Sequence, residues 1–231
     1  MQVGLNNSTM LNNINQNKEA QNSSANKLSK TKEEETVDPA IAMIANAMMS
    51  DIVTDSEGVK NANTASAMMQ IADGALSQVS DQSVKLQELS VASNNGALNA
   101  SDRSALQAEF DATVKSMDMT ISSATFNGKE LFGQDMSFSL GSSDISINLQ
   151  DINTSTLDIN SQDSIKEFTK QINSVRSDVG STQKSIQDSA ENLLNSMTQK
   201  SASANQILDS SDLAQAHKNN LSSQKVATLL E

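Results

Sequence analysis

Apolar side chains recur at alternating steps of three and four residues through two long stretches of the chain. That spacing places them along one side of an α-helix, in the heptad pattern by which helices pack side by side. The first stretch carries Ala65, Met68, Ala72, Ala75, Val79, Gln82, Leu86 and Leu89. The second carries Ile165, Phe168, Ile172, Val175, Val179, Thr182, Ile186, Ser189, Leu193 and Ser196. Because the two narrow stripes lie far apart in the sequence, we predict that the N-terminal and C-terminal halves of the chain pair with each other.

The composition favours thin helices over a thick globular core. The 231 residues include five Phe, no Tyr and no Trp, although large rings supply much of the burial in compact cores. A loop-rich fold needs more turn formers than one Pro and eight Gly. We therefore predict a mainly α fold, an elongated rod of long antiparallel helices packed like a coiled-coil bundle, with a small β-hairpin insert and terminal helices.

Local signals set the expected boundaries of the first two helices. Asp38 and Pro39 suit the start of a long helix, in which Gly58 is a candidate kink. The run Asn94–Gly96 is a helix stop, and Ser101–Asp102 is a candidate N-cap for a second helix. A short turn between two helices predicts an antiparallel helical hairpin.

An insert with strand periodicity follows the second helix. Asn127–Gly128 is typical of a tight reversal, because both positions readily adopt positive φ. Apolar residues then alternate strictly in Met136–Leu140 and in Ile145–Leu149, which predicts a β-hairpin with one buried face. Leu157 and Ile159 are expected to add an edge to it.

A long helix is predicted from about residue 161, with a break at Asp209–Asp212. The weakly patterned first 36 residues and the last segment read as helical tails, the first one disordered in the monomer. The predicted organisation is therefore an N-terminal tail 1–36, an N-terminal half of the rod 37–125, an insert 126–160, a C-terminal long helix 161–208 and a C-terminal tail 209–231.

Several functional classes are disfavoured by the same sequence. A net charge of −12 disfavours nucleic acid and anionic membrane surfaces as partners. Cysteine is absent and His217 is the single histidine, so thiolate chemistry and paired-histidine metal sites are not expected. No apolar run reaches the ~20 residues of a membrane span, the first 11 residues do not resemble a signal peptide, and no catalytic motif occurs. We expect no enzyme, no metal and no cofactor.

Three blocks of the sequence resemble bacterial flagellin. The first covers residues 71–95 and contains Leu86-Gln-Glu-Leu-Ser-Val-Ala-Ser-Asn-Asn, similar to the R-E-L-A-V-Q-S-A-N run of that family. The second covers residues 101–131 and ends on Phe126-Asn-Gly-Lys-Glu-Leu, similar to F-N-G-x-x-L. The third, residues 172–183, is similar to I-x-x-x-R-x-x-L-G-A-x-Q. Residues 144–152 also resemble the hairpin of the family, and only that hairpin stands where flagellins carry variable outer domains.

The resemblance implies a minimal flagellin, a structural subunit that polymerises into or with the flagellar filament and contributes to motility. It further implies a secreted, flagellum-associated protein that leaves through the flagellar type III export apparatus. Its implied partners are other flagellin subunits, that apparatus, a flagellin secretion chaperone and, with weakened affinity, the host flagellin receptor.

The resemblance also assigns candidate roles to individual positions. The expected subunit-packing seam is Met68, Ala72, Ala75, Val79, Leu86, Leu89, Ile172, Val175, Val179, Ile186 and Leu193. The candidate polymerisation and chaperone tail carries Leu213, Leu221, Val226, Leu229 and Leu230. The candidate immune-receptor patch is Lys85, Gln87, Glu88 and Leu89. Two family arginines fall on Lys85 and Gln87 in this patch, so receptor recognition is expected to be weaker.

Three alternatives stay open at this stage. The family's Gly, Arg and Asn before the first long helix are replaced by a charged run within Lys27–Val37, which favours a secreted flagellin-like factor that acts on host cells without polymerising. A hook–filament junction protein shares terminal helices of this kind, although the Phe126–Gly128 block favours flagellin proper. A soluble coiled-coil protein without a flagellar role is the remaining alternative.

Overall fold

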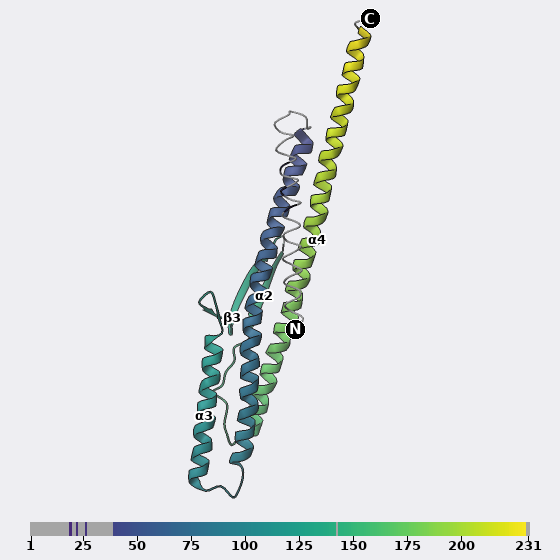
Figure 1. The fold of residues 1–231 in the computed structure, drawn as a ribbon. Coiled ribbons are helices and arrows are strands. Elements are labelled where there is room, and N and C mark those ends of the chain that lie inside the picture. The colour runs from purple at the N-terminus through teal and green to yellow at the C-terminus, as the bar shows by residue number, and fades with distance from the viewer. Residues whose placement is uncertain (1–18, 20–21, 23–25, 27–38, 142, 230–231) are drawn as a thin grey trace. The chain divides into compact units, whose positions relative to one another are not determined.

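The computed structural model describes residues 19, 22, 26, 39–141 and 143–229. Long α-helices and two small two-stranded sheets make up this part of the chain, arranged as Figure 1 shows. The elements in order are α2 (Pro39–Ser93), α3 (Ala100–Ser123), β1 (Thr125–Phe126), β2 (Lys129–Glu130), β3 (Gln134–Leu140), β4 (Ser143–Leu149) and α4 (Gln162–Leu229). The predicted mainly α fold with a small hairpin insert is confirmed.

The chain divides into two compact units. Unit 1 comprises Met1–Asn61, Ser139–Ser143 and Asp188–Glu231, and unit 2 comprises Ala62–Phe138 and Asp144–Gln187. Each of the long helices α2 and α4 contributes to both units, and so does the β3–β4 hairpin, whose tip belongs to unit 1.

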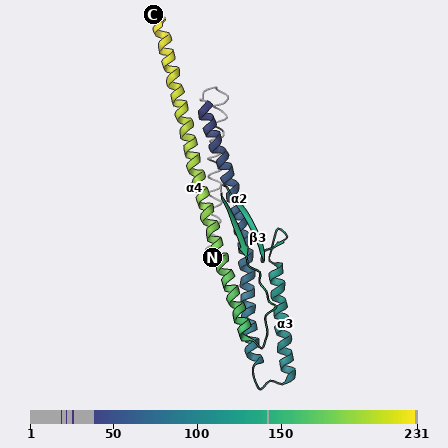
Figure 2. The same ribbon diagram turned by 180° about the vertical axis from the view of Figure 1, so that it is seen from behind.

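Three helical segments pack together in unit 2, as the two opposite views of Figures 1 and 2 agree. On α2, Asp73 pairs with Arg176 of α4 at 3.3 Å and Ser83 lies 2.6 Å from Thr169. The partner number falls as the α2 number rises, so α2 and α4 are antiparallel. The pairs Gln82–Ser116 (2.8 Å) and Lys85–Glu109 (3.0 Å) make α2 and α3 antiparallel in the same way. The predicted pairing of the two halves of the chain is confirmed.

The turn from α2 to α3 begins where the sequence predicts it, but the N-cap of α3 differs from the predicted one. α2 stops at Ser93, where the Asn94–Gly96 run predicts a stop. The predicted N-cap at Ser101–Asp102 is wrong, because Asn99 takes this place. Its Oδ1 accepts from the backbone N–H of Asp102 at 3.0 Å, and its own N–H donates to the Asp102 carboxylate at 3.3 Å. This reciprocal capping box satisfies two otherwise free donors.

The insert contains the two reversals that its sequence predicts. Asn127 and Gly128 have φ of 51° and 76° and join β1 to β2. In the β3–β4 hairpin the inward-facing side chains are buried or half-buried, and Gly141 (φ 70°) lies at the tip.

The expected edge strand at Leu157 and Ile159 is wrong, because the described insert has no strand there. Asn153 and Asp158 accept backbone N–H groups two residues ahead, from Ser155 at 2.8 Å and Asn160 at 2.9 Å. Such side-chain turns compete with strand pairing. Ile159 is nevertheless buried.

In unit 1, the start of α2 packs antiparallel against the second part of α4. Ala45 shares a buried cluster with Leu208, and Asp55 binds Lys200. The predicted break at Asp209–Asp212 is wrong, because α4 continues through it. Leu208 and Ser211 are both buried, so the helix keeps a packed face across the expected break.

The tails lie largely outside the described part of the chain. Of the predicted N-terminal tail 1–36, only residues 19, 22 and 26 are described. At the other end, Leu230 and the side chains of Leu221, Val226 and Leu229 lie outside the described residues. Among the helices that are described, none has an apolar stretch long enough to cross a membrane.

Candidate interaction surfaces

The predicted seam forms the interior of the chain. Ten of its positions are at most 9% exposed, and Ala75 is half-buried. The buried members are Met68, Ala72, Val79, Leu86, Leu89, Ile172, Val175, Val179, Ile186 and Leu193. Their side chains pack within one chain, so they hold the helices together. A role for these positions between subunits stays a prediction, and surfaces for a partner have to be sought among the exposed residues.

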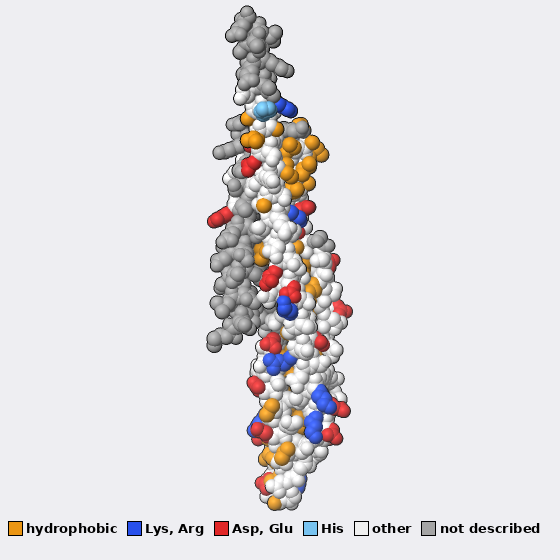
Figure 3. Space-filling view, turned by 90° about the vertical axis from the view of Figure 1, so that its right-hand side faces the viewer, with side chains coloured by type: hydrophobic (Ala, Val, Ile, Leu, Met, Phe, Trp, Pro, Cys, Tyr) orange, Lys and Arg blue, Asp and Glu red, His pale blue; other side chains and the backbone are white. Residues whose placement is uncertain are grey.

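The first turns of α2 carry apolar residues on every side. In Ile41–Met49, which we call the apolar segment, Asn46 is the single polar residue. Ala45 is fully buried and faces inward, whereas Met43 is 73% and Ile44 49% exposed. Figure 3 shows a dense group of hydrophobic side chains where α2 begins. A helix that is apolar all round is usually buried on all sides, so the apolar segment has the character of an interface.

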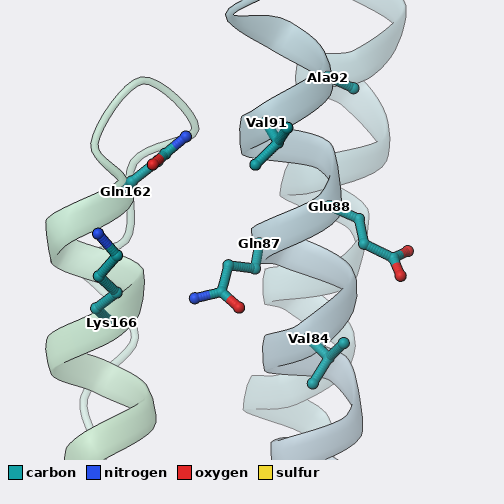
Figure 4. A pocket seen from close by; sticks show the side chains of 7 residues that line it. All are labelled: Val84, Gln87, Glu88, Val91, Ala92, Gln162 and Lys166. Atoms are coloured by element: carbon teal, nitrogen blue, oxygen red, sulfur yellow. The ribbon is translucent and has the colours of Figure 1, made fainter.

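A second exposed apolar surface lies in unit 2, where the end of α2 faces the start of α4. Val84 and Val91, which are 53% and 60% exposed, lie along an open groove of about 540 Å³. In Figure 4, Gln87 and Val91 point from α2 toward Gln162 and Lys166 of α4. The groove lining is completed by Glu88 and Ala92.

The four positions of the candidate receptor patch do not share one surface. Lys85 faces α3, where its Nζ lies 3.0 Å from Oε1 of Glu109. The hydrogen bond to Glu109 and the charge of that carboxylate raise the pKa of Lys85 above its usual 10.5. Gln87 and Glu88 both line the groove, but in Figure 4 the Gln87 side chain points toward α4 and the Glu88 side chain points away from it. Leu89 is 4% exposed and points into the core. The heptad pattern already predicts a buried Leu89, and the ion pair has no sequence signal because its partners lie 24 positions apart.

No described residues form a candidate centre for metal chemistry. The described part of the chain holds no group of three His, Asp or Glu side chains arranged to bind an ion. His217 is exposed on α4. Of the candidate tail positions, Leu213 is described and is 77% exposed, so it adds an apolar side chain to the outer face of α4.

Comparison with known proteins defines the family. The bacterial flagellin N-terminal helical region matches residues 4–136, which is more than half of the chain. The chain is 41% identical over 145 residues to secreted flagellin C of Campylobacter jejuni, covering 63% of this chain and 58% of that protein. It is 31% identical over 156 residues to flagellin of Escherichia coli O127:H6, covering 64% of this chain and 28% of that protein. The chain belongs to the bacterial flagellin family.

The matches are partial in length. The alignments span about 58% of the Campylobacter protein and 28% of the E. coli protein. Among solved structures, Bacillus cereus flagellin is 18% identical, with a TM-score of 0.45 over 61% of this chain and 88% of that chain. The sequence resemblance to flagellin is confirmed by the family match.

Proposed function

We propose that the chain is a structural flagellin subunit that is secreted and joins the flagellar filament, and that it is not an enzyme. The apolar segment Ile41–Met49 carries this proposal, because it exposes Met43 and Ile44 in the single chain. Covering about 100 Å² of apolar surface stabilises an assembly by about 2.5 kcal/mol. A repeating assembly of this chain supplies such cover once per subunit.

The other partners follow from the family and from the described surface. The exposed Leu213 gives α4 an apolar position beyond the part that packs against α2. Residues 209–231 are proposed to serve as the polymerisation and chaperone-binding tail, together with the N-terminal tail 1–36. Export through the flagellar type III apparatus and delivery by a secretion chaperone are part of the same proposal.

Weak recognition by the host flagellin receptor is also proposed. A receptor that reads this stretch of α2 meets Gln87, which carries no charge, and Lys85, whose ammonium already binds Glu109. Leu89 is not available at the surface. Exchange of Gln87 for arginine is expected to increase receptor signalling if the proposal holds.

The test is seeded assembly of the purified full chain on filament fragments, followed by sedimentation and electron microscopy. Met43→Ser and Ile44→Ser, combined, are expected to raise the protein concentration needed for assembly about tenfold, the factor in the equilibrium constant that corresponds to a loss of 1.4 kcal/mol. Met119→Ser is the matched control, because Met119 is 54% exposed on α3. If the Met43→Ser/Ile44→Ser chain and the Met119→Ser chain assemble equally well, the apolar segment is not an assembly surface. If the unsubstituted chain does not join the filament fragments, the chain is not a filament subunit.

A secreted factor that does not polymerise is the second candidate. It is favoured by the 41% identity to proteins named secreted flagellin C. Fractionation of cells that produce the chain separates the two functions, because a subunit is recovered with sheared filaments and a soluble factor is recovered in the filament-free supernatant.

A further inference from the structure

Unit 1 buries one carboxylate between its two helices. Asp55 of α2 is 4% exposed. Its Oδ2 accepts from Nζ of Lys200 at 2.8 Å and from Oγ of Ser196 at 3.1 Å. Asp51, one helical turn earlier, adds a second carboxylate 3.8 Å from the same Nζ. The carboxylate of this pair is buried, whereas the Lys200 side chain is 31% exposed. Burial of a charged group costs free energy that pairing offsets only in part, so its presence in this apolar contact calls for another role.

The apolar contacts around Asp55 repeat every seven residues. The buried apolar side chains of α2 in unit 1 are those of Ala45, Ile52 and Val59. Most buried positions of α4 in this unit form two rows with the same interval, Ala190, Met197, Ala204 and Ser211, and Leu194, Ser201 and Leu208, whereas the buried Leu193 lies outside both rows. If α4 slides along α2 by seven residues, about 10 Å, most of these buried positions meet an equivalent partner. The repeating pattern alone therefore defines the axial register weakly.

Lys200 breaks this equivalence. A slide of seven residues brings Leu193 or Ile207 to the place of Lys200. Asp55 then lies buried without a cation, which is strongly unfavourable. The hydroxyl contact does not discriminate, since Ser189 or Ser203 takes the place of Ser196.

We propose that, within unit 1, the Asp55–Lys200 ion pair selects the observed axial register of α2 against α4, acting together with the Asp73–Arg176 and Ser83–Thr169 contacts that the same two helices make in unit 2. The same register determines which residue of α4 contacts the tip of the β3–β4 hairpin. Leu193 lies against both Gly58 and Gly141, its Cδ1 and Cδ2 being 3.0 and 3.1 Å from the places where their Cβ atoms would stand. In a slid register Ile186 or Lys200 replaces it. Asp55 and Lys200 are therefore positioning residues.

The register also decides which part of α4 lies beside the apolar segment, and hence what unit 1 presents to a neighbour. That consequence rests on the proposed function, whereas the register itself is a property of the single chain. The two can fail separately, because register is read on dilute monomer and assembly is read by sedimentation.

Engineered disulfides read the register directly, since the natural chain has no cysteine. The pair Ala45→Cys with Leu208→Cys reports the observed register, in which these two residues pack together. The pairs Ile52→Cys with Leu208→Cys and Ala45→Cys with Ser201→Cys report slides in the two directions. Their cysteines are about 10 Å apart along the axis in the observed register, which is beyond the reach of a disulfide.

Each cysteine pair is combined with Asp55→Leu/Lys200→Leu, oxidised at high dilution, and the intrachain disulfide is quantified by mass spectrometry. The yield of at least one slid pair is expected to rise about tenfold over the chain that keeps Asp55 and Lys200, the factor for 1.4 kcal/mol of lost register preference. The reversed pair Asp55→Lys/Lys200→Asp is expected to restore the observed register alone. The proposal is overturned if the disulfide yield of the slid cysteine pairs is as low in the Asp55→Leu/Lys200→Leu chain as in the chain that keeps Asp55 and Lys200. It is also overturned if the slid cysteine pairs form disulfides in the Asp55→Lys/Lys200→Asp chain.

A change of fold is controlled with a second substitution. Asp55→Asn keeps the shape of the side chain and removes its charge. It is also expected to raise the disulfide yield of a slid cysteine pair. If circular dichroism shows that the Asp55→Leu/Lys200→Leu chain has lost helix, the disulfide yields of the Asp55→Asn chain test the proposal in its place.

Discussion

Gly58 of α2 lies directly against Gly141 at the tip of the β3–β4 hairpin. A Cβ added to Gly58 would stand 2.5 Å from the backbone nitrogen of Gly141 and 2.8 Å from the carbonyl carbon of Leu140. Just beyond this contact, the Asn61 side-chain amide donates to the Ser139 carbonyl oxygen at 2.8 Å. The glycine allows helix and hairpin tip to approach, and α2 continues through it without interruption.

Gly58→Ala is expected to destabilise the chain despite the better helix propensity of alanine. Overpacking against backbone costs about 1–3 kcal/mol, while the propensity gain returns at most about 1 kcal/mol. We expect a net loss of about 1–2 kcal/mol in the free energy of unfolding, measured by urea denaturation. Gly74→Ala is the control in the same helix. Nothing lies within 4 Å of its Cβ position, so it is expected to stabilise. Equal effects of the two substitutions contradict the close approach.

A partly buried hydroxyl pair joins α2 and α4 in unit 2, and its proton positions can be assigned. Thr169 donates its one proton to the carbonyl oxygen of Ile165 at 2.8 Å. Ser83, 1% exposed, must therefore donate to Oγ1 of Thr169 across 2.6 Å.

Thr169→Val removes the acceptor and leaves the Ser83 hydroxyl buried, which is expected to cost about 1–3 kcal/mol. Adding Ser83→Ala removes the stranded donor, so the double variant is expected to be more stable than Thr169→Val alone. A double-mutant cycle in urea measures the coupling. Additive effects within about 0.5 kcal/mol would show that the two hydroxyls do not interact.

Arg103 of α3 closes the end of α2. Its Nη1 donates to the Ser93 carbonyl oxygen at 2.6 Å and its Nη2 to the Asn95 carbonyl oxygen at 3.1 Å. Cations at a helix C-terminus satisfy free carbonyls and favour the helix dipole.

Arg103→Lys keeps the charge but loses the two-pronged geometry. It is expected to lower the free energy of unfolding by about 1 kcal/mol, with Arg103→Ala at least as damaging. Lys115→Ala on the exposed face of α3 is the control for removal of a cation. If Arg103→Lys is as stable as the natural chain in thermal unfolding, the charge matters and the paired hydrogen bonds do not.

The sequence was sufficient where a periodic pattern decides the structure. The steps of three and four predicted the buried faces of α2 and α4, and Asn127–Gly128 predicted its reversal. The sequence did not predict the structure where a contact between distant residues, or competition between neighbouring residues, determines it. Ser101 is as good a cap as Asn99 by residue type, and only the reciprocal bond to Asp102 selects the latter. The polar run Asp209–Asp212 resembles a break, but α4 continues through it and Ser211 is buried there.

The candidate surfaces show the same division. Heptad spacing predicts that Leu89 is buried, which conflicts with its place in a surface patch. The groove side chains on α2 and α4 lie 70 to 82 positions apart in sequence, so the groove itself could not be predicted. The apolar segment was readable as a run of apolar residues, but which of them remain exposed depends on how α4 covers Ala45.

The Lys85–Glu109 pair, which joins α2 to α3, predicts an alkaline transition. The folded-state pKa of Lys85 is raised above 10.5. The contribution of this pair to the free energy of unfolding is therefore complete below pH 10.5 and is lost as the pH rises through the folded-state pKa. Glu109→Gln removes the charge that raises it. The urea midpoint of the natural chain is expected to fall toward that of Glu109→Gln above pH 10.5, with a constant gap between them at pH 7–9. High salt narrows this gap, because both side chains are about half exposed. A gap that persists unchanged to pH 12 means that the pair does not stabilise the helical hairpin.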